Sequence, residues 1–120
     1  SKRAEVQKVT VKTSLVTGKP AVKSAKVSRQ GTKRKVTVKF TVPKACDGTD
    51  WVLAKKVSQS EDGSYTYVSG YAYTKKNQTK TTVIFKNVKP GVYYLTGRAY
   101  VKGYAKNYTK WSEVKKVVVK

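Results

Sequence analysis

Polar and apolar residues alternate along much of the chain, and the clearest run is Lys35–Val42. Every second residue of this run is apolar, and the residues between are lysine or threonine. A period of two predicts a β-strand with one buried and one solvent-facing side. The side chains expected to face the core are Val36, Val38, Phe40 and Val42. Pro43 follows directly and is expected to end the strand, because proline has no backbone N–H to donate.

Six further segments, rich in β-branched and aromatic residues, predict strands. They are Ala25–Arg29, Asp50–Ser58, Ser64–Thr74, Thr81–Val88, Val92–Val101 and Glu113–Val119. Turn-forming residues separate them. The turns are expected at Gln30–Thr32, Asp47–Asp50, Glu61–Gly63, Lys76–Gln78 and Lys89–Gly91. About seven short strands without a helical pattern predict an all-β fold, an immunoglobulin-like two-sheet antiparallel sandwich.

Two segments at opposite ends of the chain are similar to each other. Residues 4–12 and 112–120 are identical at six of nine positions, at an offset of 108 residues, which is the size of one sandwich domain. Three interpretations remain open. In the first, residues 4–12 are the closing strand of a preceding copy, residues 1–19 end in a linker, and one domain covers residues 20–120. In the second, residues 4–12 form an extra strand of this domain. In the third, the similarity arises by chance between segments rich in lysine and valine.

The stretch Thr82–Tyr94 resembles the segment of fibronectin type III domains that joins their strands E and F. In that family an apolar residue and Lys-Pro-Gly lead into a tyrosine that closes the corner, as Val88–Gly91 and Tyr93 do here. The resemblance implies that the corner residue is Tyr93 or Tyr94, and we prefer Tyr93. The next apolar positions, expected to face inward, are Leu95, Gly97 and Ala99.

Leu95–Tyr100 resembles strand F of the same family, and Tyr108–Val114 resembles the start of strand G in a bacterial subgroup that has Trp-Ser there. The resemblance covers roughly residues 20–120. It implies a fibronectin type III-like domain of a secreted or cell-surface protein attached to the wall of a Gram-positive bacterium, often in tandem with neighbouring domains. One departure is Phe40, which stands where the family usually has tryptophan, while Trp51 lies on the next strand.

The chain is strongly basic, with 27 Lys and Arg against 6 Asp and Glu and a net charge of +21. Such a surface attracts polyanions, among them nucleic acids, anionic wall polymers and sulfated or sialylated glycans. The basic residues are spread over the predicted strands and no nucleic-acid reading motif is present, so we expect no specific nucleic-acid binding. No apolar run reaches the length of a membrane span, so we expect no membrane insertion.

Residues for catalysis are scarce. The chain has no histidine, which removes the commonest general base and nitrogen metal ligand. Four of the six acids, at Asp47, Asp50, Glu61 and Asp62, fall in predicted turns and are too few for a calcium site. Cys46 is the only cysteine, so it has no intrachain disulfide partner and no histidine to activate it. We expect no enzyme activity, no metal and no cofactor.

Tyrosine is the strongest functional signal. Four tyrosines on one predicted strand share one parity and would lie on one face of an uninterrupted strand. A bulge at Ser69–Gly70 would turn part of the set to the other face, and half of the tyrosines would then pack in the core. Three residues of the predicted strand Val92–Val101, expected in the same sheet, extend the surface. Trp111 is expected to stack on Arg98. The candidate ligand-binding residues are Tyr65, Tyr67, Tyr71, Tyr73, Tyr94, Arg98 and Tyr100.

These observations predict a non-catalytic binding module whose tyrosine-rich sheet face recognises a host protein, such as a secreted glycoprotein or immunoglobulin, or a glycan. A structural spacer in a tandem array is the alternative, because of the repeat at residues 4–12 and 112–120. A binder of anionic polymers, such as a wall polymer or a glycosaminoglycan, is the second alternative, because of the net charge of +21.

Overall fold

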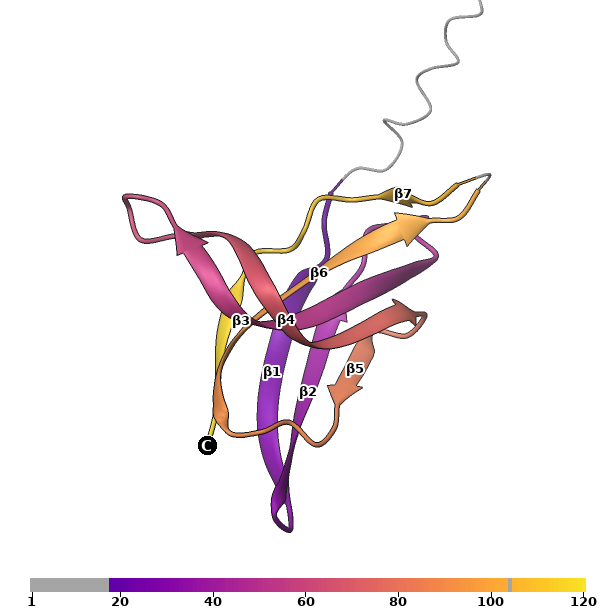
Figure 1. Cartoon of the computed structure of the whole chain (residues 1–120). Helices are drawn as coiled ribbons and strands as arrows, with labels where there is room; N and C mark the ends of the chain where they lie inside the picture. Colours follow the sequence, from indigo (N-terminus) through magenta and orange to yellow (C-terminus); the bar gives the residue numbers. More distant parts are fainter. Residues whose placement is uncertain (1–17, 104) are drawn as a thin grey trace, which may run out of the picture.

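The computed structural model describes residues 18–103 and 105–120, and this part of the chain is all-β, without a helix (Figure 1). Its eight strands form two antiparallel sheets. The strands are β1 (Ala21–Gln30), β2 (Lys33–Thr41), β3 (Gly48–Gln59), β4 (Tyr65–Gln78), β5 (Thr82–Phe85), β6 (Gly91–Val101), β7 (Asn107–Tyr108) and β8 (Lys115–Val119). The predicted all-β class is confirmed.

The two sheets are built from interleaved parts of the sequence. One sheet has the order β1-β2-β5, and the other has β4-β3-β6, with β7 and β8 both paired to β6. In Figure 1 β1 and β2 run steeply through the view, and β3, β4 and β6 cross them obliquely. The chain therefore changes sheet after β2, β4 and β5, and each sheet turns one face toward the other.

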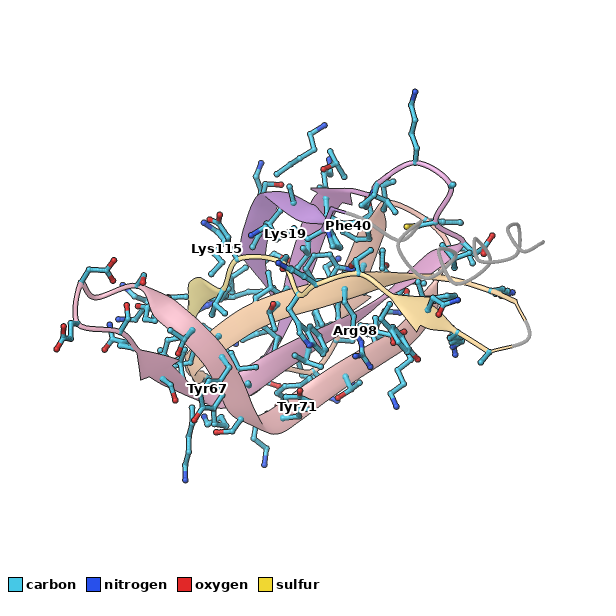
Figure 2. The ribbon with its side chains drawn as sticks, turned by 90° about the horizontal axis from the view of Figure 1, so that it is seen from above. Lys19, Phe40, Tyr67, Tyr71, Arg98 and Lys115 are labelled. Atoms are coloured by element: carbon cyan, nitrogen blue, oxygen red, sulfur yellow. The ribbon has the colours of Figure 1, made fainter. Side chains whose placement is uncertain are left out.

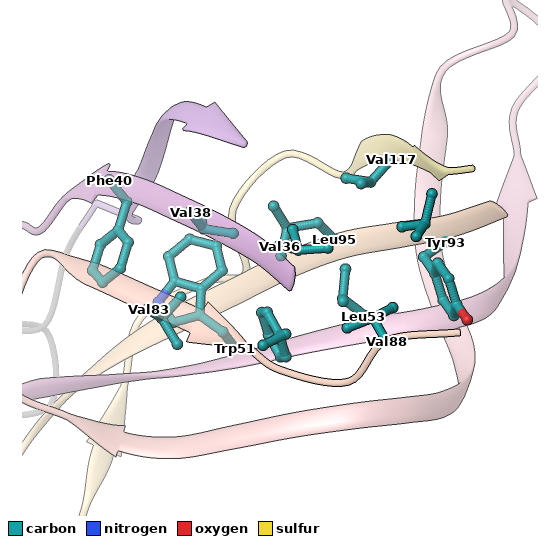
Figure 3. Close-up of a cluster of buried hydrophobic side chains, with 12 residues drawn as sticks. Val36, Val38, Phe40, Trp51, Leu53, Val83, Val88, Tyr93, Leu95 and Val117 are labelled. Carbon is teal, nitrogen blue, oxygen red and sulfur yellow. The ribbon is translucent and has the colours of Figure 1, made fainter. Parts of the chain in front are cut away.

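One buried cluster takes its side chains from both sheets (Figure 3). The first sheet contributes Val36, Val38, Phe40, Val83 and Phe85, and the second contributes Trp51, Leu53, Tyr93, Leu95, Val117 and Val119. The rings of Phe40 and Trp51 meet across the sheets at 4.6 Å between centroids. Phe40 thus occupies the core beside Trp51, as the alternation in Lys35–Val42 predicts. Val42 lies just beyond β2 and is partly buried against the same cluster.

The corner between β5 and β6 is closed by Tyr93, which confirms its expected role. Its hydroxyl donates a hydrogen bond to the carbonyl oxygen of Lys89 at 2.7 Å, and the residue is buried. The backbone N–H of Lys89 in turn donates to the hydroxyl of Tyr73 at 3.0 Å. Burial, together with the neighbouring Tyr73, raises the pKa of Tyr93 to about 12.

Several predicted boundaries differ from the structure. The turn expected at Lys76–Gln78 is wrong, since β4 continues to Gln78. Asn77 adopts a left-handed φ of 56° there, and its backbone N–H donates to the Asp50 carboxylate at 2.9 Å. This hydrogen bond holds Asn77 within β4, although asparagine is typical of a turn. The short β7 was not predicted, and residues 4–12 lie outside the described residues.

Candidate ligand-binding groove

The strand β4 carries a bulge that divides the tyrosines between two faces. Leu53 of β3 lies opposite Tyr73, and the next residue, Ala54, lies opposite Tyr71, so Ala72 is an extra residue in β4. Directly opposite residues of paired strands point to the same face. Tyr73 therefore follows Leu53 into the core, whereas Tyr71 follows Ala54 to the outer face. The expectation of one tyrosine face is wrong, because a bulge divides the set as the alternative foresaw. The bulge lies at Ala72, however, and the predicted position at Ser69–Gly70 is wrong, since the register is regular there.

The outer face of the five-stranded sheet contains a groove of ≈230 Å³. One wall is β4, with Tyr65, Thr66, Tyr67, Val68 and Tyr71, and the other wall is the segment Trp111, Ser112, Glu113 and Val114. Thr96 of β6 and Lys19 complete the lining. Tyr67 and Tyr71 lie along β4 in Figure 2. Tyr67 is 65% exposed, Tyr71 54% and Trp111 36%, so the walls present three accessible rings.

The wall that carries Trp111 is fixed to β6 by hydrogen bonds although it is not part of a strand. The hydroxyl of Thr96 donates to the carbonyl oxygen of Ser112 at 2.8 Å, and the backbone N–H of Gly97 donates to the hydroxyl of Ser112 at 3.0 Å. A third bond runs from the Ser112 N–H to the carbonyl oxygen of Gly97 at 2.6 Å. Ser112 therefore holds Trp111 in place over the sheet.

A second hollow of ≈520 Å³ adjoins the groove and shares Lys19, Glu113 and Val114 with it. It extends along the start of β1 to Lys115. At the junction the ammonium of Lys19 lies 3.7 Å from the carboxylate of Glu113, and both side chains are well exposed. Lys19 and Lys115 are labelled in Figure 2. The two hollows together can accommodate a ligand longer than a single small molecule.

Three of the seven predicted binding residues, Tyr65, Tyr67 and Tyr71, line the groove. Tyr94 lies beside it, half-buried, with its ring 5.5 Å from that of Tyr65 in an edge-to-face contact. Tyr73 is not available to a ligand on this face, because it packs against the core and bonds to Lys89. Its assignment to the binding surface is therefore corrected.

The assignment of Tyr100 to the binding surface is also wrong, since only 1% of the residue is exposed. It lies on the outer side of β6 as expected, but Gly48 leaves room for its ring: a Cβ at Gly48 would come within 2.6 Å of the ring carbon Cζ. The ring of Tyr108 also packs against it, at 6.2 Å between centroids. Burial raises the pKa of Tyr100, and the charges of Asp50 and Asp47 add to this effect.

Arg98 stacks on two aromatic rings. Its guanidinium carbon lies 3.7 Å from the centre of the Tyr108 ring and 4.6 Å from that of Trp111. The contact with Trp111 confirms the expectation from the sequence. Tyr108, which lies on the unpredicted β7, supplies the second ring. Trp111 is thus shared between the groove and the Arg98 stack, a role that sequence reasoning missed although the Trp-Ser motif pointed to this residue.

Among the residues that line the groove, Glu113 is the one acid, and there is no cysteine or histidine. Across residues 18–103 and 105–120, no three His, Cys, Asp or Glu residues lie close enough to hold a metal ion. Cys46 is half-buried, and burial followed by the charge of Asp47 raises the pKa of its thiol. The same part of the chain contains no helix that is long and apolar enough to cross a membrane.

No protein-family model matches the chain, and no curated protein matches it. The geometry of the groove, its three exposed rings and its charged rim are therefore the basis for assigning a function.

Proposed function

We propose that the chain is a fibronectin type III-like, non-catalytic binding module of a bacterial surface or secreted protein, and that it binds a glycan in the groove. The strand orders β1-β2-β5 and β4-β3-β6-β8 support this fold, because the family pairs its strands as A-B-E and C′-C-F-G. The corner bond from Tyr93 to Lys89 and the Trp111-Ser112 pair support it further.

The observation that carries the proposal is the exposure of Tyr67, Tyr71 and Trp111 on the two walls of one groove. Sugar rings have faces of C–H groups that pack on aromatic rings, while their hydroxyl groups need hydrogen-bond partners. Tyrosine and tryptophan provide a rigid apolar surface together with a polar end. The carboxylate of Glu113 and the ammonium of Lys19 at the rim are suited to sugar hydroxyls.

A glycan fits this site better than a protein does. A stable protein interface buries about 800 Å² on each partner and is centred on a packed apolar patch. Here the exposed rings line a groove of ≈230 Å³ that continues into a hollow of ≈520 Å³. A chain of several sugar units matches such an elongated depression.

The test is binding to immobilised glycans, both neutral and acidic, with the double variant Tyr67→Ser/Tyr71→Ser. Each aromatic contact contributes about 0.5–1.5 kcal/mol, so we expect the affinity to fall by about tenfold or more. Both side chains are more than half exposed, so the urea midpoint should not change. Val92→Ser, at an exposed position outside the groove, is the matched control and should bind normally.

Two results would contradict the proposal. Undiminished glycan binding by the double variant would show that the groove is not the site. Capture of a host protein, without binding to any glycan, would favour protein recognition at the same surface.

A spacer role is the second candidate, and one observation favours it. In Figure 1 the described chain enters at the top of the view and ends near the bottom, so the two ends lie on opposite sides of the domain. Such a placement allows copies to follow one another in a line. A rod-like profile of two linked copies in small-angle scattering, with no binding to any glycan, would support this role.

A further inference from the structure

The Arg98 stack has the properties of a prepared anion site. The side chain rises from β6, and its guanidinium is in contact with the rings of Tyr108 and Trp111 at 3.7 and 4.6 Å. Arginine held in this way keeps its charge and loses little further freedom when a ligand binds. A flexible surface arginine would lose that freedom on binding.

The guanidinium has neither a hydrogen-bond partner nor a counter-ion within the described part of the chain. Its Nε atom is buried and makes no hydrogen bond. Asp50 lies directly opposite Arg98 in the register of β3 and β6, and yet its carboxylate accepts a hydrogen bond from Asn77. Among residues 18–103 and 105–120 the only ion pair joins Lys19 and Glu113. A buried N–H without a hydrogen-bond partner is unusual in a folded protein.

The two rings determine how a ligand can approach. They lie against the guanidinium, and Arg98 as a whole is half-buried, so part of the side chain stays accessible. Two parallel N–H groups in one plane match the two oxygens of a carboxylate. Trp111, which carries Arg98 on its ring, also lines the groove, so a carboxylate at Arg98 would belong to a ligand that contacts the groove.

We infer that the groove selects an acidic glycan, one that carries a carboxylate as uronic or sialic acids do, and that Arg98 is the residue that recognises this group. The inference rests on the proposed glycan-binding function. The surrounding charge agrees with it, because Lys19 and Lys115 line the adjoining hollow and the chain has a net charge of +21. These charges attract the ligand from a distance, and the oriented guanidinium distinguishes a glycan with an acidic group from a neutral one.

The experiment measures affinity for matched pairs of glycans at physiological salt. The pairs are sialyllactose and lactose, a hyaluronan hexasaccharide and its carboxyl-reduced form, and a galacturonate hexamer and its reduced form. A keratan sulfate hexasaccharide, which carries sulfate but no carboxylate, is the sulfated comparison. We expect at least one carboxylate-bearing member to bind ten times more tightly than its neutral partner. Arg98→Gln should remove this preference, because a charged hydrogen-bonded pair contributes about 10- to 100-fold.

Two further variants separate recognition from general charge and from folding. Lys39→Gln removes one positive charge from an exposed position on the other sheet, and should keep the preference. Arg98→Lys keeps the charge but lacks the planar pair of N–H groups, and should lose most of the preference. Thermal unfolding of each variant shows whether the fold is retained.

The outcomes distinguish the two proposals. Three results would each overturn the inference and leave the groove a glycan site. They are equal binding of the neutral and acidic members, a preference that survives Arg98→Gln or Arg98→Lys, and tighter binding of the sulfated glycan. Failure of every glycan to bind would overturn the proposed function as well.

Discussion

Gly97→Ala is the sharpest test of how Trp51 is packed in the core. Gly97 of β6 lies opposite Trp51 of β3, and the indole ring lies across the glycine. A Cβ atom at this position would overlap the indole carbons Cδ2 and Cε3 and would come within 2.7 Å of Cε2. Gly97 has no left-handed φ, so the need for glycine here arises from space and not from backbone conformation.

The size of the effect follows from how tightly Trp51 is held. The ring is fully buried, lies 4.6 Å from Phe40, and donates its Nε1–H to the hydroxyl of Thr49 at 3.0 Å. Normal carbon contacts are about 3.5–4.0 Å, so the ring would have to move by roughly 1 Å. Overpacking of this kind lowers the free energy of unfolding by about 1–3 kcal/mol. About 0.4–1 kcal/mol of this loss is offset, because alanine restricts the unfolded chain more than glycine does.

We therefore expect Gly97→Ala to lower the free energy of unfolding by about 1–2 kcal/mol. The urea midpoint, followed by far-UV circular dichroism, should fall by about 1 M, given the usual dependence on denaturant for a chain of this size. Gly103→Ala is the matched control, because its Cβ would meet only the carbonyl oxygen of Ala105, at an ordinary 3.6 Å. The midpoint of this control should hardly change.

A second substitution checks the cause. Trp51→Leu makes room for a methyl group, so alanine at Gly97 should cost much less in that background than in the wild type. Equal midpoints for Gly97→Ala and Gly103→Ala, or an undiminished cost beside leucine, would refute the packing of Trp51 on Gly97.

Three further predictions concern titration. The pKa of Tyr93 is about 12 in the folded chain and about 10 in the unfolded one. The contribution of this shift to stability is therefore complete below pH 10 and is lost as the pH rises toward 12. Tyr93→Phe should flatten this part of a plot of urea midpoint against pH. Hydrogen bonds from Ser60 and then Ser64 lower the pKa of Asp62 to about 2, and Ser60→Ala should raise it in a carboxyl-carbon NMR titration. Burial and then Asp47 raise the pKa of Cys46, so its alkylation at pH 8 should be slower than that of free cysteine and faster in Asp47→Asn.

Local patterns in the sequence were sufficient to predict the core of the fold. The alternation in Lys35–Val42 identified Val36, Val38 and Phe40 as buried, because the side-chain period of a strand decides which face a residue occupies. The corner residue came from the resemblance of Val88–Gly91 to the fibronectin type III corner, which implied that a tyrosine closes it, and the hydroxyl of Tyr93 does donate to Lys89.

The division of the tyrosines could not be predicted, because it depends on pairing between strands. Tyr71 and Tyr73 share a parity, and only the register against Leu53 and Ala54 shows that Ala72 is the extra residue. Tyr100 was assigned to the surface from its parity alone. Its burial depends on Gly48, more than fifty residues earlier in the sequence, and on β7, which two residues form.

The exposure of the groove rings separates the binding and spacer roles on energetic grounds. Tyr67, Tyr71 and Trp111 keep about a third to two thirds of their surface in water, so they contribute less to folding than buried rings do. A spacer gains nothing from them, and clustered apolar surface makes a protein prone to association. The hydrogen bonds of Ser112 with Thr96 and Gly97 nevertheless hold one wall of this cluster in place. Serine at Tyr67 and Tyr71 should therefore leave folding unchanged under either role, and only the binding role requires that a measurable affinity be lost.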